Sequence, residues 1–145
     1  MLGKAPTLAA DELVLDLEDA VPVAGKDGAR ERVVVALASG SLAGRNVAVR
    51  VNGLDTPWCH RDVLLLVERA GGAVGSLVLP KVERGGDVEW VDRYLVMLGG
   101  PAVGIRLQAL IETAAGLAAA AEIAAASPRL DALILDRGAA ALARA

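Results

Sequence analysis

The chain has 145 residues, of which 54% are hydrophobic and 2% aromatic, and its formal net charge is −3. This length suits one domain with a sizeable core, which must be built from Val, Leu, Ile and Ala. An acidic chain has no basic stripe to neutralise phosphates, which argues against a nucleic-acid binder. The single cysteine, Cys59, excludes an intrachain disulfide and a cysteine-rich zinc site. With no visible signal peptide and no apolar run of the roughly 18–20 residues that a membrane span needs, we expect a cytoplasmic protein.

Apolar runs of strand-like composition alternate with helical segments along the chain. The expected strands are 13–17, 47–51, 75–79, 103–111 and 131–135. The expected helices are 26–38, about 57–70, 85–98 and 113–126, while 1–10 could be the tail of a helix and 138–145 the start of another. The strand starts near residues 13, 47, 75, 105 and 131 have the spacing of βα units and leave no room for hairpins. The pattern therefore predicts a parallel sheet with right-handed crossovers.

Two architectures fit five βα units. Length favours an open doubly wound parallel sheet, because a (β/α)8 barrel takes about 250 residues. Polar residues in mid-strand favour the barrel, since alternation along 105–112 puts Arg106 and Gln108 on one face with Leu110. A barrel lumen tolerates such residues when they are paired, whereas a sheet covered on both faces has little use for them. We expect a single, incomplete TIM-barrel domain over residues 1–145 with about five parallel βα units, and the open doubly wound sheet is the alternative.

Charged and polar residues gather where the expected strands end. They are Asp16, Glu18 and Asp19 after the first strand, Arg50 and Asn52 after the second, Lys81 and Glu83 after the third, and Glu112 after the fourth. The carboxyl ends of parallel strands lie at one edge of the sheet, so these groups should converge. Clustered carboxylates suit a hard cation such as Mg²⁺. Arg50 suits bidentate recognition of a substrate carboxylate.

Each of these residues also has an ordinary structural interpretation. A single acid at a strand end is more often a helix cap or a solvated charge than a ligand. Lys81 would then be exposed and paired with Glu83 or another acid, rather than act as a Schiff-base amine. We expect no catalytic role for His60 or Cys59. We expect a packing or interface role for Trp58.

Four segments together resemble the HpcH/HpaI aldolase and citrate lyase β-subunit family. They read Leu15-Asp16-Leu17-Glu18-Asp19-Ala20-Val21, Val49-Arg50-Val51-Asn52-Gly53, Leu79-Pro80-Lys81-Val82-Glu83 and Ala109-Leu110-Ile111-Glu112-Thr113-Ala114-Ala115-Gly116. They come in the family's order and at family-like spacings, and the similarity covers about residues 4–135. The resemblance implies a (β/α)8 barrel that forms a homotrimer or hexamer. It also implies a Mg²⁺-dependent carbon–carbon lyase acting on short acyl-CoA esters of the malyl-, citramalyl- or citryl-CoA type, which releases a keto acid or acetyl-CoA.

The resemblance assigns roles to five residues of this sequence. Glu112 would be a metal ligand, and Arg50 would hold the carboxylate of the keto-acid fragment. Glu18 and Asp19 would lie in the metal's outer shell or steady Arg50. Lys4 would lie near the CoA side of the substrate.

The sequence departs from the family in three places. The family's second metal ligand is the Asp of a Gly-x-Glu-Asp-Leu-like segment, which by ungapped count falls on Ala139, so Asp136 would replace it only if the loop shifted. The family also begins one strand earlier and continues to a C-terminal lid that carries an acid/base group. Three functions therefore remain open: an acyl-CoA ester lyase, a truncated and catalytically silent remnant or binding subunit, and an aldolase that cleaves hydroxy-keto acids without CoA.

Overall fold

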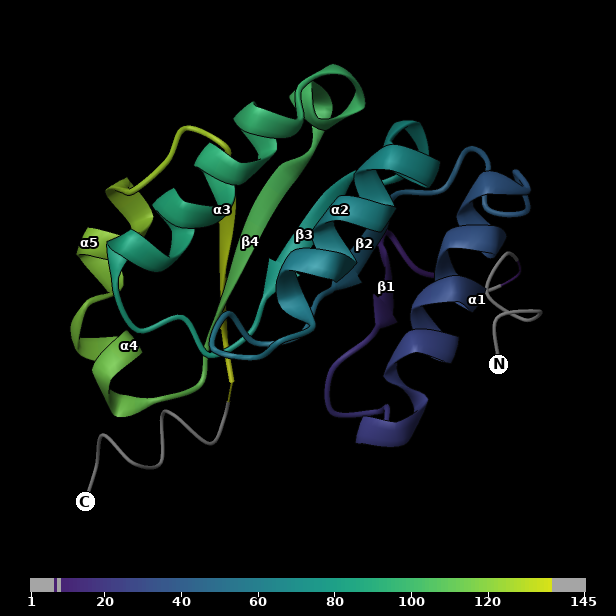
Figure 1. Ribbon diagram of the computed structural model, residues 1–145. Helices are drawn as coiled ribbons and strands as arrows, with labels where there is room; N and C mark the ends of the chain where they lie inside the picture. The colour runs from purple at the N-terminus through teal and green to yellow at the C-terminus, as the bar shows by residue number, and fades with distance from the viewer. Residues whose placement is uncertain (1–6, 8, 137–145) are drawn as a thin grey trace.

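Strands and helices alternate along the whole described part of the chain (Figure 1). The structure, a computed structural model, describes residue 7 and residues 9–136. The strands are β1 (Leu13–Asp16), β2 (Val47–Arg50), β3 (Ser76–Leu79), β4 (Arg106–Ile111) and β5 (Leu130–Leu135). The α-helices are α1 (Lys26–Ala38), α2 (Cys59–Ala70), α3 (Gly85–Leu98), α4 (Ala114–Ala118) and α5 (Ala120–Ala125). Three short 3-10 helices, η2 (Val23–Gly25), η3 (Gly71–Ala73) and η4 (Gly100–Gly104), lie in the connections.

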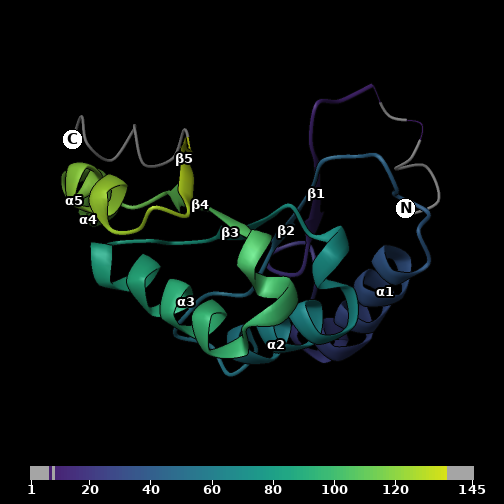
Figure 2. The same ribbon diagram turned by 90° about the horizontal axis from the view of Figure 1, so that it is seen from above.

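The five strands form one parallel sheet in the order β1-β2-β3-β4-β5. When the strand order follows the chain order, right-handed crossovers place the connecting helices on one side of the sheet. Figure 2 shows α1, α2 and α3 in an arc along one side of the curved sheet. A doubly wound sheet instead reverses its strand order and carries helices on both faces. The expected α/β class is therefore confirmed, with the winding of a (β/α)8 barrel rather than that of the open doubly wound alternative.

The hydrophobic core lies between the sheet and the arc of helices. Alternate strand residues such as Leu15, Val49 and Leu107 are buried on this side against helix residues such as Val63. The other side of β4 carries Gln108, whose amide donates to the Glu12 carboxylate at 3.0 Å. The alternation expected for β4 is confirmed, and the polar residues on the concave side have partners, as a barrel lumen requires.

Strands β1, β2, β3 and β5 each differ from the sequence expectation by one residue at one end, and larger differences occur in three places. The expected helix 113–126 breaks at Ala119, after which α5 packs on α3 with Ile123 fully buried. The strand expected from residue 103 begins at Arg106, because η4 occupies the preceding residues. Helix α2 begins at Cys59, because the Thr56 hydroxyl donates to the Gly53 carbonyl and forms a turn instead of a cap. Of the helix tail expected over residues 1–10, the described residues 9 and 10 are not helical, while residues 1–6 and 8 and the helix start expected at 138–145 lie outside the described residues. Over residue 7 and residues 9–136, no helix is long and apolar enough to cross a membrane.

Candidate functional site

The chain folds back on itself directly after β1, and Asp16 holds this turn. Its Oδ1 accepts a hydrogen bond from the Glu18 amide at 2.8 Å, and its Oδ2 accepts one from the Ala20 amide at 3.2 Å. Both contacts are made by one side chain to its own loop, so the turn is encoded locally. The turn leaves Glu18 buried and Asp19 exposed, both at the carboxyl edge of the sheet.

Lys26, the first residue of α1, supports the same turn. Its Nζ donates to the carbonyl oxygens of Leu17 at 2.9 Å and Glu18 at 2.7 Å. The ammonium also lies 5.7 Å from the centre of the Trp58 ring, within cation–π range. A cation in the first turn of a helix opposes the helix dipole. The two carbonyl contacts and the aromatic face compensate for that position and hold the acidic turn against α1.

Arg50, at the end of β2, contacts three acids of the acidic turn. Its Nε and Nη2 donate to the two oxygens of Asp16 at 2.8 and 2.5 Å, a bidentate pair. Its Nη1 lies 3.1 Å from Glu18 Oε2 and 3.9 Å from Asp19 Oδ2. The hydrogen bonds to Asp16 raise the pKa of Arg50. Burial acts to raise the pKa of Asp16, but the hydrogen bonds from Arg50 and from two backbone amides outweigh it, and the pKa is lowered.

A buried ion pair between α1 and α2 fixes the loop after β2. Asp62, on α2, is fully buried and accepts from the Asn52 amide at 2.9 Å and from Asn52 Nδ2 at 2.6 Å. Its other oxygen accepts from Arg30 Nε of α1 at 2.6 Å. A buried carboxylate needs such partners, because it has lost its hydration. The ion pair therefore ties both helices to the residue two places after Arg50.

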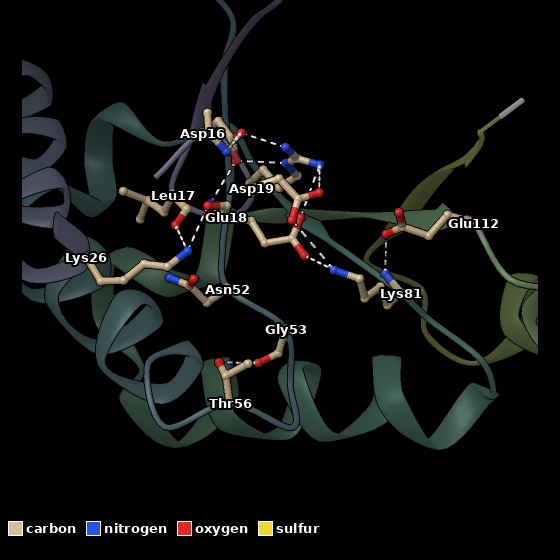
Figure 3. A network of polar contacts seen from close by, with 12 residues as sticks. Asp16, Leu17, Glu18, Asp19, Lys26, Asn52, Gly53, Thr56, Lys81 and Glu112 are labelled. Atoms are coloured by element: carbon tan, nitrogen blue, oxygen red, sulfur yellow. Dashed lines mark hydrogen bonds and ion pairs between the residues drawn. The ribbon is translucent and has the colours of Figure 1, made fainter. Parts of the chain in front are cut away.

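Lys81 connects the acidic turn to the end of β4 (Figure 3). Its ammonium forms an ion pair with Glu18 and lies 3.8 Å from Asp19 Oδ1. Its backbone amide donates to Glu112 Oε1 at 2.9 Å. Its φ of 53° lies in the left-handed region, and it is the one non-glycine residue among those described with a positive φ. Lys81 is thus exposed and paired with an acid, as the sequence predicts, but its partner is Glu18 rather than Glu83.

The motif after Glu112 has a direct structural reason. The Thr113 hydroxyl accepts a hydrogen bond from the Gly116 amide at 3.0 Å and caps α4. A Cβ added at Gly116 would lie 2.3 Å from the carbonyl oxygen of Val82, so this position requires glycine. The start of α4 therefore packs directly against the loop after β3. Glu112 is consequently held beside Lys81.

Two acidic residues follow neighbouring strands at the carboxyl edge of the sheet. The Asp136 amide donates to the Ile111 carbonyl at 3.0 Å, so the strand register places residues 112 and 136 side by side. Among the described residues, no three His, Cys, Asp or Glu side chains are grouped to hold a metal. Mg²⁺ needs only one or two protein carboxylates, because waters and substrate oxygens complete its shell. Glu112 and Asp136 end neighbouring strands at the same edge of the sheet.

The charge around this edge also suits a divalent cation. Four carboxylates lie near two cations, which leaves two negative charges; the acids are Asp16, Glu18, Asp19 and Glu112, and the cations are Arg50 and Lys81. One oxygen of Glu18, Oε2, is buried without a hydrogen-bond donor. An anionic substrate would meet repulsion here unless a cation bound with it.

The structure brings together Arg50, Glu18 and Asp19 as the strand ends predict, and it links them to Glu112 through Lys81. Lys4 lies outside the described residues. Sequence reasoning missed the supporting pair Asp62 and Arg30. A signal was present, because Asp62 directly precedes the apolar run 63–67 in α2, where an acid facing the core needs a partner.

Known proteins resemble this chain over nearly its whole length. The model of the HpcH/HpaI aldolase/citrate lyase family matches residues 1–143. A protein of Cereibacter sphaeroides (strain ATCC 17025 / ATH 2.4.3) named L-malyl-CoA/beta-methylmalyl-CoA lyase is 41% identical over 138 residues, which are 93% of this chain and 43% of that protein. The citrate lyase subunit beta of Leuconostoc mesenteroides subsp. cremoris is 36% identical over 140 residues, which are 94% of this chain and 45% of that protein. The chain thus spans less than half the length of these relatives.

Solved structures share the same arrangement of elements. RipC from Yersinia pestis superposes with a TM-score of 0.71 at 37% identity, over 90% of this chain and 54% of that one. The Haloferax volcanii malate synthase reaches a TM-score of 0.78 at 20% identity, over 100% of this chain and 49% of that one, and at that identity it supports the fold alone. The family match over residues 1–143, together with relatives of 36–41% identity, shows that the chain belongs to the HpcH/HpaI aldolase/citrate lyase family.

Proposed function

We propose that the chain carries the keto-acid and Mg²⁺ site of a carbon–carbon lyase that acts on short acyl-CoA esters of the malyl-, citramalyl- or citryl-CoA type. The observation that carries this proposal is the setting of Arg50. The names of the relatives, malyl-CoA lyase and citrate lyase β subunit, support the substrate class.

Hydrogen bonds to Asp16 orient one edge of the Arg50 guanidinium, while Nη1 at the other edge makes ion pairs with Glu18 and Asp19. Asp16 occupies Nε and Nη2 through two hydrogen bonds. Nη1 faces Glu18 Oε2 at 3.1 Å, but that oxygen receives no hydrogen bond. A substrate carboxylate can therefore take the Nη1 edge without dismantling the pair with Asp16. The planar, fixed fork then sets the orientation of the keto-acid fragment.

Mg²⁺, held by Glu112 and Asp136, would supply a Lewis acid that polarises the oxygen on the carbon undergoing cleavage. Glu112 Oε1 is fixed by the Lys81 amide at 2.9 Å, so its other oxygen is free to turn to a ligand. Glu18 and Asp19 steady the Nη1 edge of Arg50. These residues bind and orient the substrate.

In the cleavage direction, the hydroxyl group of the substrate loses its proton and its oxygen forms the new carbonyl. The carbon–carbon bond breaks, and its electron pair moves to the α-carbon of the thioester and its carbonyl oxygen. Protonation of the α-carbon completes acetyl-CoA, and the other product is the keto acid. A separate acid/base group must move these protons.

A cleavage assay on the purified chain tests the proposal. We expect malyl-CoA and Mg²⁺ to yield a keto acid, trapped as its phenylhydrazone, and Glu112→Ala to abolish this product. Arg50→Lys keeps the charge but loses the fork, and we expect KM to rise about 10- to 100-fold. Glu89→Ala, on the exposed side of α3, is the matched control. Turnover that persists in Glu112→Ala, or without any divalent cation, would contradict the proposal.

The other two functions predict different results in the same assay. A catalytically silent binding subunit would bind glyoxylate with Mg²⁺ and lose this binding in Arg50→Lys, yet cleave nothing. A CoA-independent aldolase would cleave a free hydroxy-keto acid and leave malyl-CoA intact. Three further expectations stay predictions. They are the homo-oligomeric assembly, the cytoplasmic location, and the single, incomplete domain over residues 1–145.

A further inference from the structure

We propose that Lys81 is a substrate-binding cation, whose Nζ binds the oxygen of the acyl thioester that becomes negatively charged during cleavage. This inference rests on the proposed function and adds a residue to its site. Three observations carry it: the position of Lys81 between two parts of the site, its backbone conformation, and the exposed ammonium, of whose three N–H donors Glu18 takes one.

Lys81 lies where the acidic turn meets a groove. The groove has a volume of about 1000 Å³ and is lined by the loops after β2, β3 and β4 and by α3, with Leu54, Pro80, Trp90 and Ala115 among its walls. Lys81 lines the same groove, while its ammonium contacts Glu18 beside Arg50. If Arg50 holds the carboxylate of the keto acid, the acyl arm extends from there across Lys81 into the groove. The thioester oxygen then lies near Lys81.

The backbone of Lys81 is held in a conformation that side chains disfavour. Its φ is 53°, and such residues persist where the surrounding structure enforces them, often at functional sites. Here the enforcing contacts are the amide hydrogen bond to Glu112 at 2.9 Å and the ion pair with Glu18. The backbone therefore fixes a candidate metal ligand while the side chain points to the acids.

The ammonium can bind a ligand oxygen without leaving Glu18. An ammonium has three N–H donors, and Glu18 Oε1 accepts one of them. The Lys81 side chain is 51% exposed and lines the groove, so its other donors can reach a ligand there. An ammonium held in place beside a developing oxyanion stabilises a transition state more than the bound substrate. If Lys81 formed only a surface ion pair, its loss would affect the binding of neutral and negatively charged ligands equally.

A matched pair of ligands tests this role without turnover. Acetyl-CoA carries a neutral thioester oxygen, whereas S-carboxymethyl-CoA, a thioether, carries a carboxylate one carbon farther from the sulfur. Their dissociation constants are measured by calorimetry with Mg²⁺ for the wild type, Lys81→Met, Lys81→Arg and the control Arg93→Met, which changes an exposed cation of α3. We expect Lys81→Met to weaken S-carboxymethyl-CoA about tenfold or more and acetyl-CoA less than about threefold. Lys81→Arg should restore most of the loss.

The outcomes separate this inference from the proposed function. Equal weakening of both ligands in Lys81→Met would mean that Lys81 only supports its loop, and the inference would be wrong. Unchanged binding of both ligands in that variant would also overturn the inference, while the proposed function stands. If the wild type binds glyoxylate but neither CoA ligand, the CoA-ester class itself fails, and the role of Lys81 fails with it.

Discussion

The positive φ of Lys81 lowers the stability of the folded chain, and this effect can be measured separately from the effect of the ammonium charge. At a φ of 53° a Cβ crowds the backbone, and glycine is free of this crowding. Lys81→Ala and Lys81→Gly both remove the ammonium and keep the amide that donates to Glu112. We expect the glycine variant to be more stable than the alanine variant by about 1 kcal/mol, measured by urea denaturation.

The same two substitutions at Arg93 give the opposite order. Arg93 is exposed in the middle of α3, where alanine favours the helix over glycine by about 0.5–1 kcal/mol. An alanine variant at position 81 that is as stable as the glycine variant would mean that the left-handed conformation stores no strain.

The pair between Asp16 and Arg50 makes stability depend on pH in a defined window. The pKa of Asp16 is lowered in the folded chain, because its hydrogen bonds outweigh the effect of burial. A carboxylate with a lowered pKa stabilises the fold fully above its unfolded pKa of about 3.9, and this contribution is lost as the pH falls through the folded pKa. We expect Asp16→Asn to be less stable than the wild type by about 1–3 kcal/mol at pH 6.

This difference should shrink as the pH falls below about 4, because the wild-type carboxyl becomes protonated there. Urea denaturation at pH 6 and pH 3.5 measures it. Asp11→Asn, at an exposed position outside this network, is the control and should show little difference at either pH. A gap between Asp16→Asn and the wild type that stays constant would show that the pair contributes through shape rather than charge.

At the scale of elements, the ion pair of Asp62 and Arg30 joins β2, α1 and α2. Asp62→Ala leaves the Arg30 guanidinium buried at 3% exposure, and its Nη2 already lacks a partner. Breaking a buried pair on one side costs about 3–5 kcal/mol. We expect urea denaturation to show a loss of that size. Glu31→Ala, which breaks the exposed pair of Glu31 with Arg69 between the same two helices, should change stability little.

The sequence predicts the helices and strands well, but it predicts poorly the side-chain contacts that hold them together. Helices α1 and α3 have the bounds that the sequence indicates, because Gly and Pro mark their ends and their periodicity is local. The break at Ala119 is not visible, since an alanine-rich segment has no side chain that signals a kink. The strand ends place Arg50, Glu18 and Asp19 together through parallel topology alone. The contacts of Lys81 to Glu18 and of Asp62 to Arg30 depend on three-dimensional packing, so spacing could not predict them.

At the scale of the whole molecule, the arc of helices covers one face of the sheet. Val14 of β1, on the opposite face, is 53% exposed, and Leu133 and Leu135 of the edge strand β5 are 38% and 55% exposed. The buried residues instead concentrate between the middle strands and α1–α3. Stability measurements should therefore report on this central core, and the cysteine lies within it.

Cys59 offers a direct measure of how that core opens. It is the only cysteine in the chain and is 1% exposed at the start of α2. Burial, together with the charges of Asp62 and Asp55, raises its pKa to about 12. Both effects suppress the reactive thiolate, so labelling by iodoacetamide at pH 8 requires the thiol to become exposed. We expect no labelling of the native chain within the time that labels a denatured sample fully.

With added urea, labelling should rise with the same midpoint as the loss of helical circular dichroism, because α2 is packed into the core through Val63, Leu66 and Val67. A Cys59→Ala chain with Ser39→Cys, whose position is exposed after α1, should label at once and serves as the control. Labelling at Cys59 well below the unfolding midpoint would show that α2 detaches by itself. In that case the contacts of Asp62 with Arg30 and Asn52 would be too weak to hold the loop after Arg50 against α2.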